Sequence, residues 1–452
     1  MTNLETGEPI TMSLPFGNLD TTFESFLQEL PEDYRELAIE FKAFTRSRKI
    51  KTPEQLMQVV MNYCGMDAVL RETAGNFTLL EERISDTAIH NRLRAGVPWV
   101  KAVLSRMMGE AAKPLLEGGL RFLVVDGSTA QGPGATGTEH RLHLAIDLVR
   151  LHLVHVVVTD EHTGEHVRHY PLQNGDVVVV DQGYNQVDRW MEHADRGVGL
   201  VVRYNAHGVN LYDAQGNKIE VEQLLRETTD ADAGLPVQVR TKQKTVLDGH
   251  LHADRRPPAQ AAAARRRARA AAKKNGRHIQ SRTLALAEWV LIWTTVPPEV
   301  LPTDAVMALY RVRWPVELAI KRLKSIINID QLRTRKNSVL ADLYLHGKLL
   351  YAWVVEKRLH RRCGRDWNRL DRPRQATPWR LWKLLRRELT SAISSVSQWN
   401  LSRWAEAVKV IQERPRRRQL QTVPERVRRL IASCQAQGLR GCEKTPPECS
   451  PI

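Results

Sequence analysis

The chain has few cysteines and no long apolar segment. Its five cysteines are an odd number, are scattered along 452 residues and form no CxxC pair. This usage is typical of a reducing compartment and argues against a disulfide framework or a zinc knuckle. No uncharged apolar run reaches 18 residues, so no transmembrane helix and no membrane partner are expected. The first 20 residues lack the basic start and apolar core of a secretory signal, so we expect a cytoplasmic protein.

Positive charge is concentrated in the last third of the chain. Residues 313–452 contain 31 Lys and Arg against 12 Asp and Glu, a net charge of +19, whereas residues 1–312 carry −3. The usual partner of such a surface is a polyanion, most often nucleic acid. A ribosomal or tRNA-binding scaffold would share this feature. The clusters Arg414–Arg418 and Arg426–Arg429 are expected to follow a DNA backbone, and a solvated charged face or a dimer contact is the alternative.

The two ends of the chain have helical patterns. Residues 1–118 are predicted to form a helical N-terminal DNA-binding region. Within it, "FTLLEER", "SDTAIHNRLRAG" and "PWVKAVLSRMM" fit either a helix-turn-helix or an ordinary helical bundle. Residues 351–452 are predicted to be a basic helical region with a tail.

The middle of the chain has the pattern of an α/β domain. Residues 119–205 contain "LRFLVVDGS", "HRLHLAIDLV", "LHLVHVVVTD" and "DVVVVDQGY", then a helical segment and the strand-like "VGLVVRYN". These strands predict a mixed sheet. Residues 206–298 interrupt it as a β-rich insertion, in which "LALAEWVLIWTTV" is expected to be a strand and an Ala/Arg run a basic helix ending at Gly276. Residues 299–350 return to the core.

Two carboxylates follow apolar strands of this domain. Asp126 ends "LVVD" and Asp181 ends "VVVD", and a glycine follows each of them closely. Ligands bind at this edge of open α/β sheets. Two neighbouring carboxylates stay ionised only beside a cation, and Mg²⁺ or Mn²⁺ is held by one to three carboxylates together with substrate phosphates. The rival acids on or near these strands are Asp147, Asp160 and Asp176, with Asp147 the strongest.

A third acid lies in the basic stretch "YRVRWPVELAIKRLKS". If this stretch forms one helix, five of its side chains fall within roughly 80° of the helix surface, namely Tyr310, Arg313, Glu317, Lys321 and Lys324. Pro315 removes a helical hydrogen bond and is expected to begin a new helix, which would place Tyr310 and Arg313 across a kink. Glu317 is therefore interpreted as a metal ligand whose basic neighbours reach for phosphates.

The spacing Tyr310-x2-Arg313-x3-Glu317-x6-Lys324 resembles the YREK signature of bacterial insertion-sequence transposases of the DDE type. "DGS" at Asp126, "DQGY" at Asp181 and a gap of 135 residues before Glu317 occur in the order of that family. The similarity covers about residues 85–350. Gln182 departs from it, because many relatives carry Arg after the second acid.

This resemblance implies a ribonuclease-H-like fold and phosphoryl transfer with two Mg²⁺ ions, for which Mn²⁺ would substitute. Asp126 would bridge both ions, Asp181 would bind one and Glu317 the other. Tyr310, Arg313, Lys321 and Lys324 would contact DNA. The partners would be double-stranded terminal repeats and target DNA, bound by a homodimer or a larger assembly. A nuclease of the same fold and a non-catalytic nucleic-acid-binding protein are the alternatives.

Other motifs carry weaker indications. "GPGATG" (132–137) matches GxGxxG but precedes a strand, so a loop is expected and no nucleotide cofactor. His162, His166 and His169 lack an ordered metal-ligand spacing. Trp289 and Trp293 share a face of one strand and are expected in the core. In some relatives an insertion-domain tryptophan stacks on a base flipped from the duplex, which would suit a hairpin-forming reaction.

Overall fold

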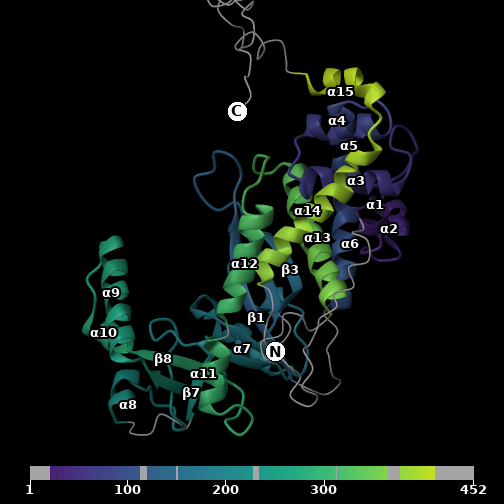
Figure 1. Ribbon diagram of the computed structural model, residues 1–452. Coiled ribbons are helices and arrows are strands. Elements are labelled where there is room, and N and C mark those ends of the chain that lie inside the picture. Colours follow the sequence, from purple (N-terminus) through teal and green to yellow (C-terminus); the bar gives the residue numbers. More distant parts are fainter. Residues whose placement is uncertain are drawn as a thin grey trace, which may run out of the picture.

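The computed structural model describes residues 21–111, 120–148, 151–227, 234–311, 313–364 and 377–412. They form a mixed sheet, a helical body beside it and a helical projection formed by α9 and α10 (Figure 1). No helix within these ranges has the length and apolar character needed to cross a membrane. The strands are β1 (Arg121–Ala130), β2 (His140–Asp147), β3 (His152–Asp160), β4 (Asp176–Val180), β5 (Gly199–Arg203), β6 (Leu235–Arg240), β7 (Val246–Arg255) and β8 (Trp289–Thr294).

Helices precede, interrupt and follow the sheet. The N-terminal set is α1 (Phe23–Leu27), α2 (Tyr34–Glu40), α3 (Pro53–Cys64), α4 (Leu70–Leu80), α5 (Asp86–Ala95) and α6 (Val97–Ala111). Among the strands lie α7 (Val187–Ala194), α8 (Val221–Glu227), α9 (Pro258–Lys274) and α10 (Ser281–Leu286). The last set is α11 (Thr303–Arg311), α12 (Trp314–Ile327), α13 (Val339–Cys363), α14 (Pro378–Ser394) and α15 (Trp404–Ile411).

The sheet has the strand order β3-β2-β1-β4-β5-β8-β7-β6. Strands β1, β2 and β3 pair antiparallel, whereas β4 runs parallel to both β1 and β5. All residues of the Val-rich β4 are buried, as expected for a strand covered on both faces. The α/β class and the mixed sheet are confirmed, and the order of the first five strands is consistent with a ribonuclease-H-like core. The segment 132–137 is the expected loop between β1 and β2.

The insertion strands extend the same sheet. Strand β8 pairs antiparallel with β5, with Val201 opposite Thr294, and β7 and β6 follow outward. The prediction of a strand over "LALAEWVLIWTTV" is wrong in its first half, because α10 covers Ser281–Leu286. The Leu and Ala residues at the start of this segment have high helix propensity, and they lie outside the sheet, whose strand β8 begins at Trp289. The Ala/Arg run forms α9 as predicted, and Gly276, with φ +61°, follows its end.

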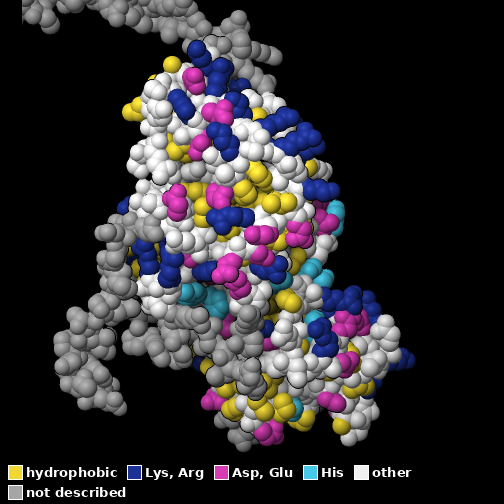
Figure 2. All heavy atoms as spheres, turned by 90° about the vertical axis from the view of Figure 1, so that its right-hand side faces the viewer, with side chains coloured by type: hydrophobic (Ala, Val, Ile, Leu, Met, Phe, Trp, Pro, Cys, Tyr) yellow, Lys and Arg dark blue, Asp and Glu magenta, His cyan; other side chains and the backbone are white. Residues whose placement is uncertain are grey.

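The helices from the two ends of the chain share one body. Helix α13 packs against α3, α5, α6 and α14, and α15 packs on α4. Helix α13 runs through residue 350, so the predicted boundary there falls inside a helix. The three segments considered for a helix-turn-helix correspond to α4, α5 and α6, which lie within this body. The face in Figure 2 shows Lys and Arg side chains interspersed with Asp and Glu over these helices.

A buried arginine connects distant parts of this body. The Arg358 guanidinium is fully buried on α13 and donates to Glu29 Oε1 at 3.2 Å and to Glu388 Oε1 at 2.8 Å. It also donates to the Ser25 carbonyl oxygen at 2.7 Å. Glu29 and Glu388 also pair with Arg361 and Arg362, so Arg358 is the buried centre of a larger ionic network.

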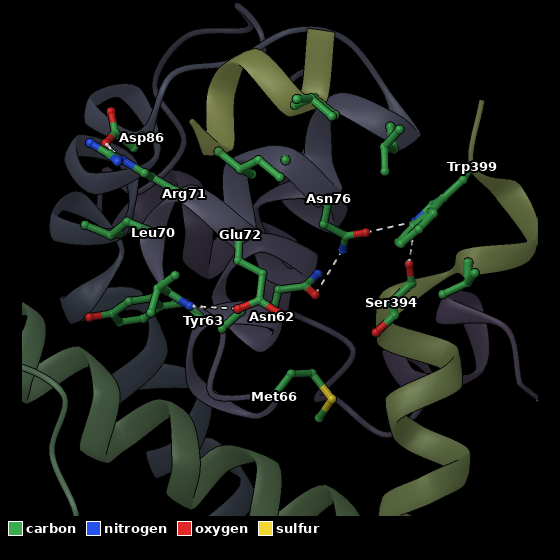
Figure 3. Close-up of a pocket in the computed structure, with 18 of the residues that line it drawn as sticks. Asn62, Tyr63, Met66, Leu70, Arg71, Glu72, Asn76, Asp86, Ser394 and Trp399 are labelled. Atoms are coloured by element: carbon green, nitrogen blue, oxygen red, sulfur yellow. Dashed lines mark hydrogen bonds and ion pairs between the residues drawn. The ribbon is translucent and has the colours of Figure 1, made fainter. Parts of the chain in front are cut away.

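The helical body also contains a largely apolar cavity of about 1130 Å³ (Figure 3). Three of its polar side chains form a hydrogen-bonded chain, in which Trp399 donates to Asn76 Oδ1 at 2.9 Å and Asn76 donates to Asn62 Oδ1 at 3.0 Å. None of the predicted metal ligands lines this cavity.

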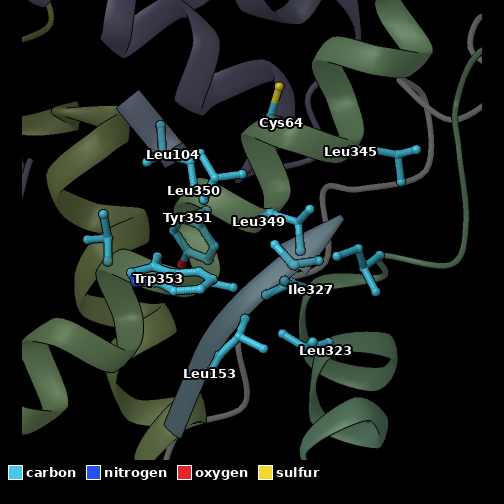
Figure 4. Close-up of a cluster of buried hydrophobic side chains, with 14 of the residues drawn as sticks. Cys64, Leu104, Leu153, Leu323, Ile327, Leu345, Leu349, Leu350, Tyr351 and Trp353 are labelled. Carbon is cyan, nitrogen blue, oxygen red and sulfur yellow. The ribbon is translucent and has the colours of Figure 1, made fainter. Parts of the chain in front are cut away.

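A continuous apolar core joins the helical body to the sheet (Figure 4). Leu349 and Leu350 of α13 lie in it with Leu153 of β3. Leu323 and Ile327 bring α12 into the same cluster. The helix that carries Glu317 is thereby anchored to both the sheet and the helical body.

Candidate active site

Asp126 on β1 and Asp181, directly after β4, occupy equivalent positions relative to two neighbouring parallel strands. The register pairs Arg121 with Asp176 and Val124 with Val179, and the same offset relates Asp126 to Asp181. Each carboxylate accepts a 2.8 Å hydrogen bond from the backbone N–H of the residue after it. The two predicted acids therefore lie side by side, with similar local constraints on each side chain.

Helix α12 brings Glu317 to the same place. Its buried residues Val316, Ile320, Leu323 and Ile327 form an apolar face that packs in the core with Val124 of β1. Beyond the helix, Gln131 N donates to the Asp330 carbonyl oxygen at 3.0 Å, and Leu332 N donates to the Gln131 carbonyl oxygen at 2.9 Å. The helix is thus fixed to β1 at both its face and its end, and Glu317 stays 47% exposed.

Arg313 lies among the three carboxylates. It immediately precedes α12, and the break between α11 and α12 falls where the proline predicted a new helix. Its Nη1 lies 3.4 Å from Asp126 Oδ2, and its Nη2 lies 3.4 Å from Asp181 Oδ2 and 2.5 Å from Glu317 Oε1. Burial opposes the charge of Arg313, but these acids outweigh it and raise the pKa of the guanidinium.

Tyr310 and Arg203 hold Asp181 from the other side. The Tyr310 hydroxyl donates to Asp181 Oδ1 at 3.2 Å, and Arg203 Nη1 lies 3.5 Å from the same oxygen. The Arg203 guanidinium also lies 5.7 Å from the centre of the Tyr310 ring. Three of the four signature residues therefore lie at one carboxylate site, namely Tyr310, Arg313 and Glu317.

Two contributors were not predicted from the sequence. Arg203 is one, and the end of "VGLVVRYN" at the carboxyl edge of β5 was its only signal. Glu165 is the other: a methyl group added at Gly183 would lie 2.6 Å from its Oε2, and one at Gly127 would overlap its Oε1. The glycines that follow Asp126 and Asp181 closely were the signal, because they leave room for this fourth carboxylate.

The electrostatics reflect this crowding of acids. Burial raises the pKa of Asp126 to about 6, and the negative charges of Glu165 and Asp181 act in the same direction. The Gly127 N–H and Arg313 oppose that rise. The site thus holds more carboxylates than its two arginines neutralise.

The remaining predicted residues lie farther along α12 or elsewhere. Lys321 is exposed and Lys324 is half-buried, both on the helix that carries Glu317. Of the rival acids, Asp176 forms a 2.7 Å ion pair with Arg121, and Asp160 accepts from its own turn. Asp147 pairs with Leu123, three residues before Asp126 on β1. His166 and His169 stack with ring centres 3.8 Å apart.

A cavity of about 790 Å³ opens beside the acids and extends under the insertion. Glu317, Arg313 and Gln182 line it on the side of the acids, whereas Arg256 and Trp289 line it on the side of the insertion. Trp289 and Trp293 share a face of β8, but Trp293 is fully buried and stacks on Trp190 with ring centres 4.8 Å apart. Only Trp289 of this pair is therefore accessible from the cavity.

The donor set fits a hard divalent cation, which prefers carboxylate oxygens. The observation in favour is that one guanidinium draws together carboxylates from β1, the β4 end and α12. Arg313 lies among the carboxylates. Within the described ranges no three acidic, His or Cys side chains are spaced to hold a metal ion.

Comparison with known proteins identifies the class. Residues 117–353 match the transposase DDE domain family. This range contains Asp126, Asp181 and Glu317. The match covers more than half of the chain, so the chain belongs to this family and is a DNA transposase of the DDE type.

Named relatives agree with that assignment. The chain is 27% identical over 344 residues to the putative transposase InsL for insertion sequence element IS186A of Escherichia coli K12, covering 72% of this chain and 90% of the relative. The transposase for IS421 of Escherichia coli is equally similar over 345 residues. The transposase for IS231F of Bacillus thuringiensis is 24% identical over 40% of each chain. A solved piggyBac transposase synaptic complex with hairpin DNA covers 88% of this chain and 85% of its own at 9% identity and a TM-score of 0.37.

Proposed function

We propose that the chain cleaves the ends of an insertion sequence and joins them to target DNA at a site formed by Asp126, Asp181 and Glu317. The observation that carries this proposal is the approach of all three carboxylates to a single cation, Arg313. The acids come from segments separated by up to 191 residues in sequence, and ordinary surface ion pairing does not require such convergence.

These three carboxylates would hold Mg²⁺, with Mn²⁺ as a substitute. When bound, the metal would activate the attacking oxygen and stabilise the leaving oxygen of the phosphodiester. The role of the protein is positional. Backbone N–H groups and Tyr310 fix the orientation of the two aspartates, and α12 sets the distance of Glu317 from them.

The signature residues would bind DNA beside this centre. Arg313 neutralises carboxylates in the free protein, and a bound metal would free its guanidinium for a phosphate. Lys321 and Lys324 lie on the same helix, within reach of a strand that passes Glu317. Trp289 is the tryptophan that could stack on an unpaired base, because Trp293 is buried. The DNA partners would be terminal repeats and target DNA, bound by a homodimer or a larger assembly.

The test is cleavage and strand transfer on duplexes carrying the ends of the element, with Mg²⁺. Asp126→Ala, Asp181→Ala and Glu317→Ala should each lower both rates by at least about 1000-fold, since a lost metal ligand removes several kcal/mol of transition-state stabilisation. DNA binding in EDTA should change little.

The exposed Glu299 supplies a matched control. Glu299→Ala should cleave and join DNA at the wild-type rate. Near wild-type cleavage by Glu317→Ala would show that the metal ligands are misassigned. Cleavage without any joining would instead identify a nuclease of the same fold.

A further inference from the structure

The cavity between the catalytic acids and the insertion is lined by five arginines, and two of them have no ion pair within the described residues. These two are Arg256, just after β7, and Arg267 on α9. The other three have acidic partners: Arg311 lies 2.9 Å from Asp254, Arg203 lies 3.5 Å from Asp181, and Arg313 lies among the catalytic acids.

Arg256 and Arg267 differ from these neighbours. Over the described ranges neither side chain has an ion pair or a side-chain hydrogen bond, and the buried Arg256 Nε has no acceptor. Glu288 is nearby but is paired with Arg255 and Arg265. Burial lowers the pKa of Arg256, and the guanidinium groups of Arg203 and Arg267 lower it further, against smaller opposing effects of Tyr310 and Asp254. The fold therefore holds like charges together at a cost that a bound anion would remove.

The position of the cavity indicates which anion would bind there. It begins at Glu317 and Gln182, beside the proposed cleavage site, and continues beneath α9. A strand advances about 3.4 Å per nucleotide in B-form DNA, so a cavity of about 790 Å³ spans only a few nucleotides. Figure 1 shows α9 and α10 projecting from the sheet on that side, where they could cover a strand leaving the catalytic acids.

We propose that Arg256 and Arg267 form a binding site for one phosphodiester of the cleaved DNA strand, within a few nucleotides of the scissile phosphate. Two guanidinium groups can share the oxygens of one phosphate through charge-assisted hydrogen bonds. The site would couple the insertion to the core, because the anion is held by residues of both β7 and α9. This inference rests on the proposed catalytic site only for the position of the scissile phosphate.

The test measures binding in EDTA, so that no cleavage occurs. Full-length protein is titrated with duplexes of the element ends in which successive phosphates of the cleaved strand are replaced by neutral methylphosphonates. For the wild type, replacement at one position should weaken binding about tenfold, the loss expected for a charge-assisted hydrogen bond. For Arg256→Ala/Arg267→Ala, binding should be weaker at the start and insensitive to replacement at that position.

Arg269→Ala is the matched control, because Arg269 is exposed on α9 and does not line the cavity. It should keep the position-specific loss. Thermal unfolding of the free double variant should show a Tm equal to or above that of the wild type, since a like-charge contact has been removed. A lowered Tm with an unchanged methylphosphonate profile would assign these arginines a structural role and overturn the proposal.

Two further arms separate the possible sources of failure. Inorganic phosphate at constant ionic strength should not compete at millimolar concentration, and saturable competition would mean a small-anion site in place of a DNA contact. Asp126→Ala should keep the methylphosphonate profile. If Asp126→Ala cleaves normally, the catalytic assignment fails while the phosphate site stands; if the profile is flat in every protein, the phosphate site fails alone.

Discussion

At the scale of single residues, the free protein places a cation where the catalytic metal is expected. The Arg313 side chain is only 14% exposed and contacts Asp126, Asp181 and Glu317. A buried cation among acids stabilises the fold as long as both partners are present, and removal of one leaves uncompensated charge. The same arginine can therefore hold the site together before metal and DNA arrive.

Arg313→Ala should make the stability of the protein depend on Mg²⁺. Without the guanidinium the carboxylates repel one another, so the free variant should unfold at a lower Tm than the wild type. Added Mg²⁺ should raise the Tm of the variant more than that of the wild type, because binding to the folded state alone adds stability by mass action. Thermal unfolding with EDTA and with Mg²⁺ measures both effects. Equal Mg²⁺ shifts in the two proteins would contradict a cation-replacing role for Arg313.

At the scale of elements, close contact between α3 and α13 holds the helical body together. Gly347 on α13 faces Cys64 on α3, and a methyl group there would lie 2.5 Å from Cys64 Sγ and 2.6 Å from Cys64 Cβ. The neighbouring residues Leu345, Leu349 and Leu350 are fully buried in the core that also anchors α12. Separation of these two helices would therefore disturb the support of Glu317.

Gly347→Ala should destabilise the protein by about 1–3 kcal/mol, the usual cost of forcing an extra carbon into a packed core. Gly109→Ala is the matched control, because Gly109 lies on α6 with nothing within 4 Å of an added methyl group. That change should stabilise the chain by up to about 1 kcal/mol through helix propensity. Urea unfolding of both variants gives the comparison. Equal shifts would mean that the α3–α13 contact is easily relaxed.

At the scale of the whole molecule, a single carboxylate helps to join the helical body to the catalytic sheet. Glu356 on α13 accepts a hydrogen bond of 2.9 Å from the backbone N–H of Leu153 on β3, the edge strand of the sheet. Burial raises the pKa of Glu356 to about 6, and the Leu153 N–H and Arg322 only partly oppose this. The folded state therefore binds the proton of Glu356 more tightly than the unfolded chain does.

The sign of the resulting pH dependence follows from linkage. The contribution of Glu356 to stability is fully present below its unfolded pKa, near 4.5, and is lost as the pH rises through about 6. Glu356→Gln keeps an acceptor for Leu153 without the titration. The free energy of unfolding of this variant should rise relative to that of the wild type between pH 5 and pH 7.5, by up to about 2 kcal/mol.

Urea unfolding at a series of pH values measures that difference. The exposed Glu40 provides the control, and Glu40→Gln should show no such trend. A constant difference between wild type and Glu356→Gln across the range would show that Glu356 does not titrate there.

The local chemistry of the sequence predicted much of the fold and pointed to the acids that the structure brings together. Alternating and continuous apolar runs predicted β1 to β5, because a strand with one or two buried faces needs those patterns. Asp126 and Asp181 stood out because each ends an apolar run, and Glu317 because it is an acid in a basic stretch. Pro315 correctly marked the break before α12. The roles of Lys321 and Lys324 remain predictions, and the clusters at 414–418 and 426–429 lie outside the described residues.

Only the tertiary structure decided which distant residues meet. The offset between β1 and β4 that aligns Asp126 with Asp181 depends on strand register, which no local pattern specifies. Arg203 and Glu165 reach the acids through the ends of β5 and a loop after β3, and Arg313 points inward at carboxylates in the free protein. The insertion joins the same sheet through β5 and β8, and this pairing creates the arginine-lined cavity. Such contacts arise from long-range packing and charge, so they appear only once the chain is folded.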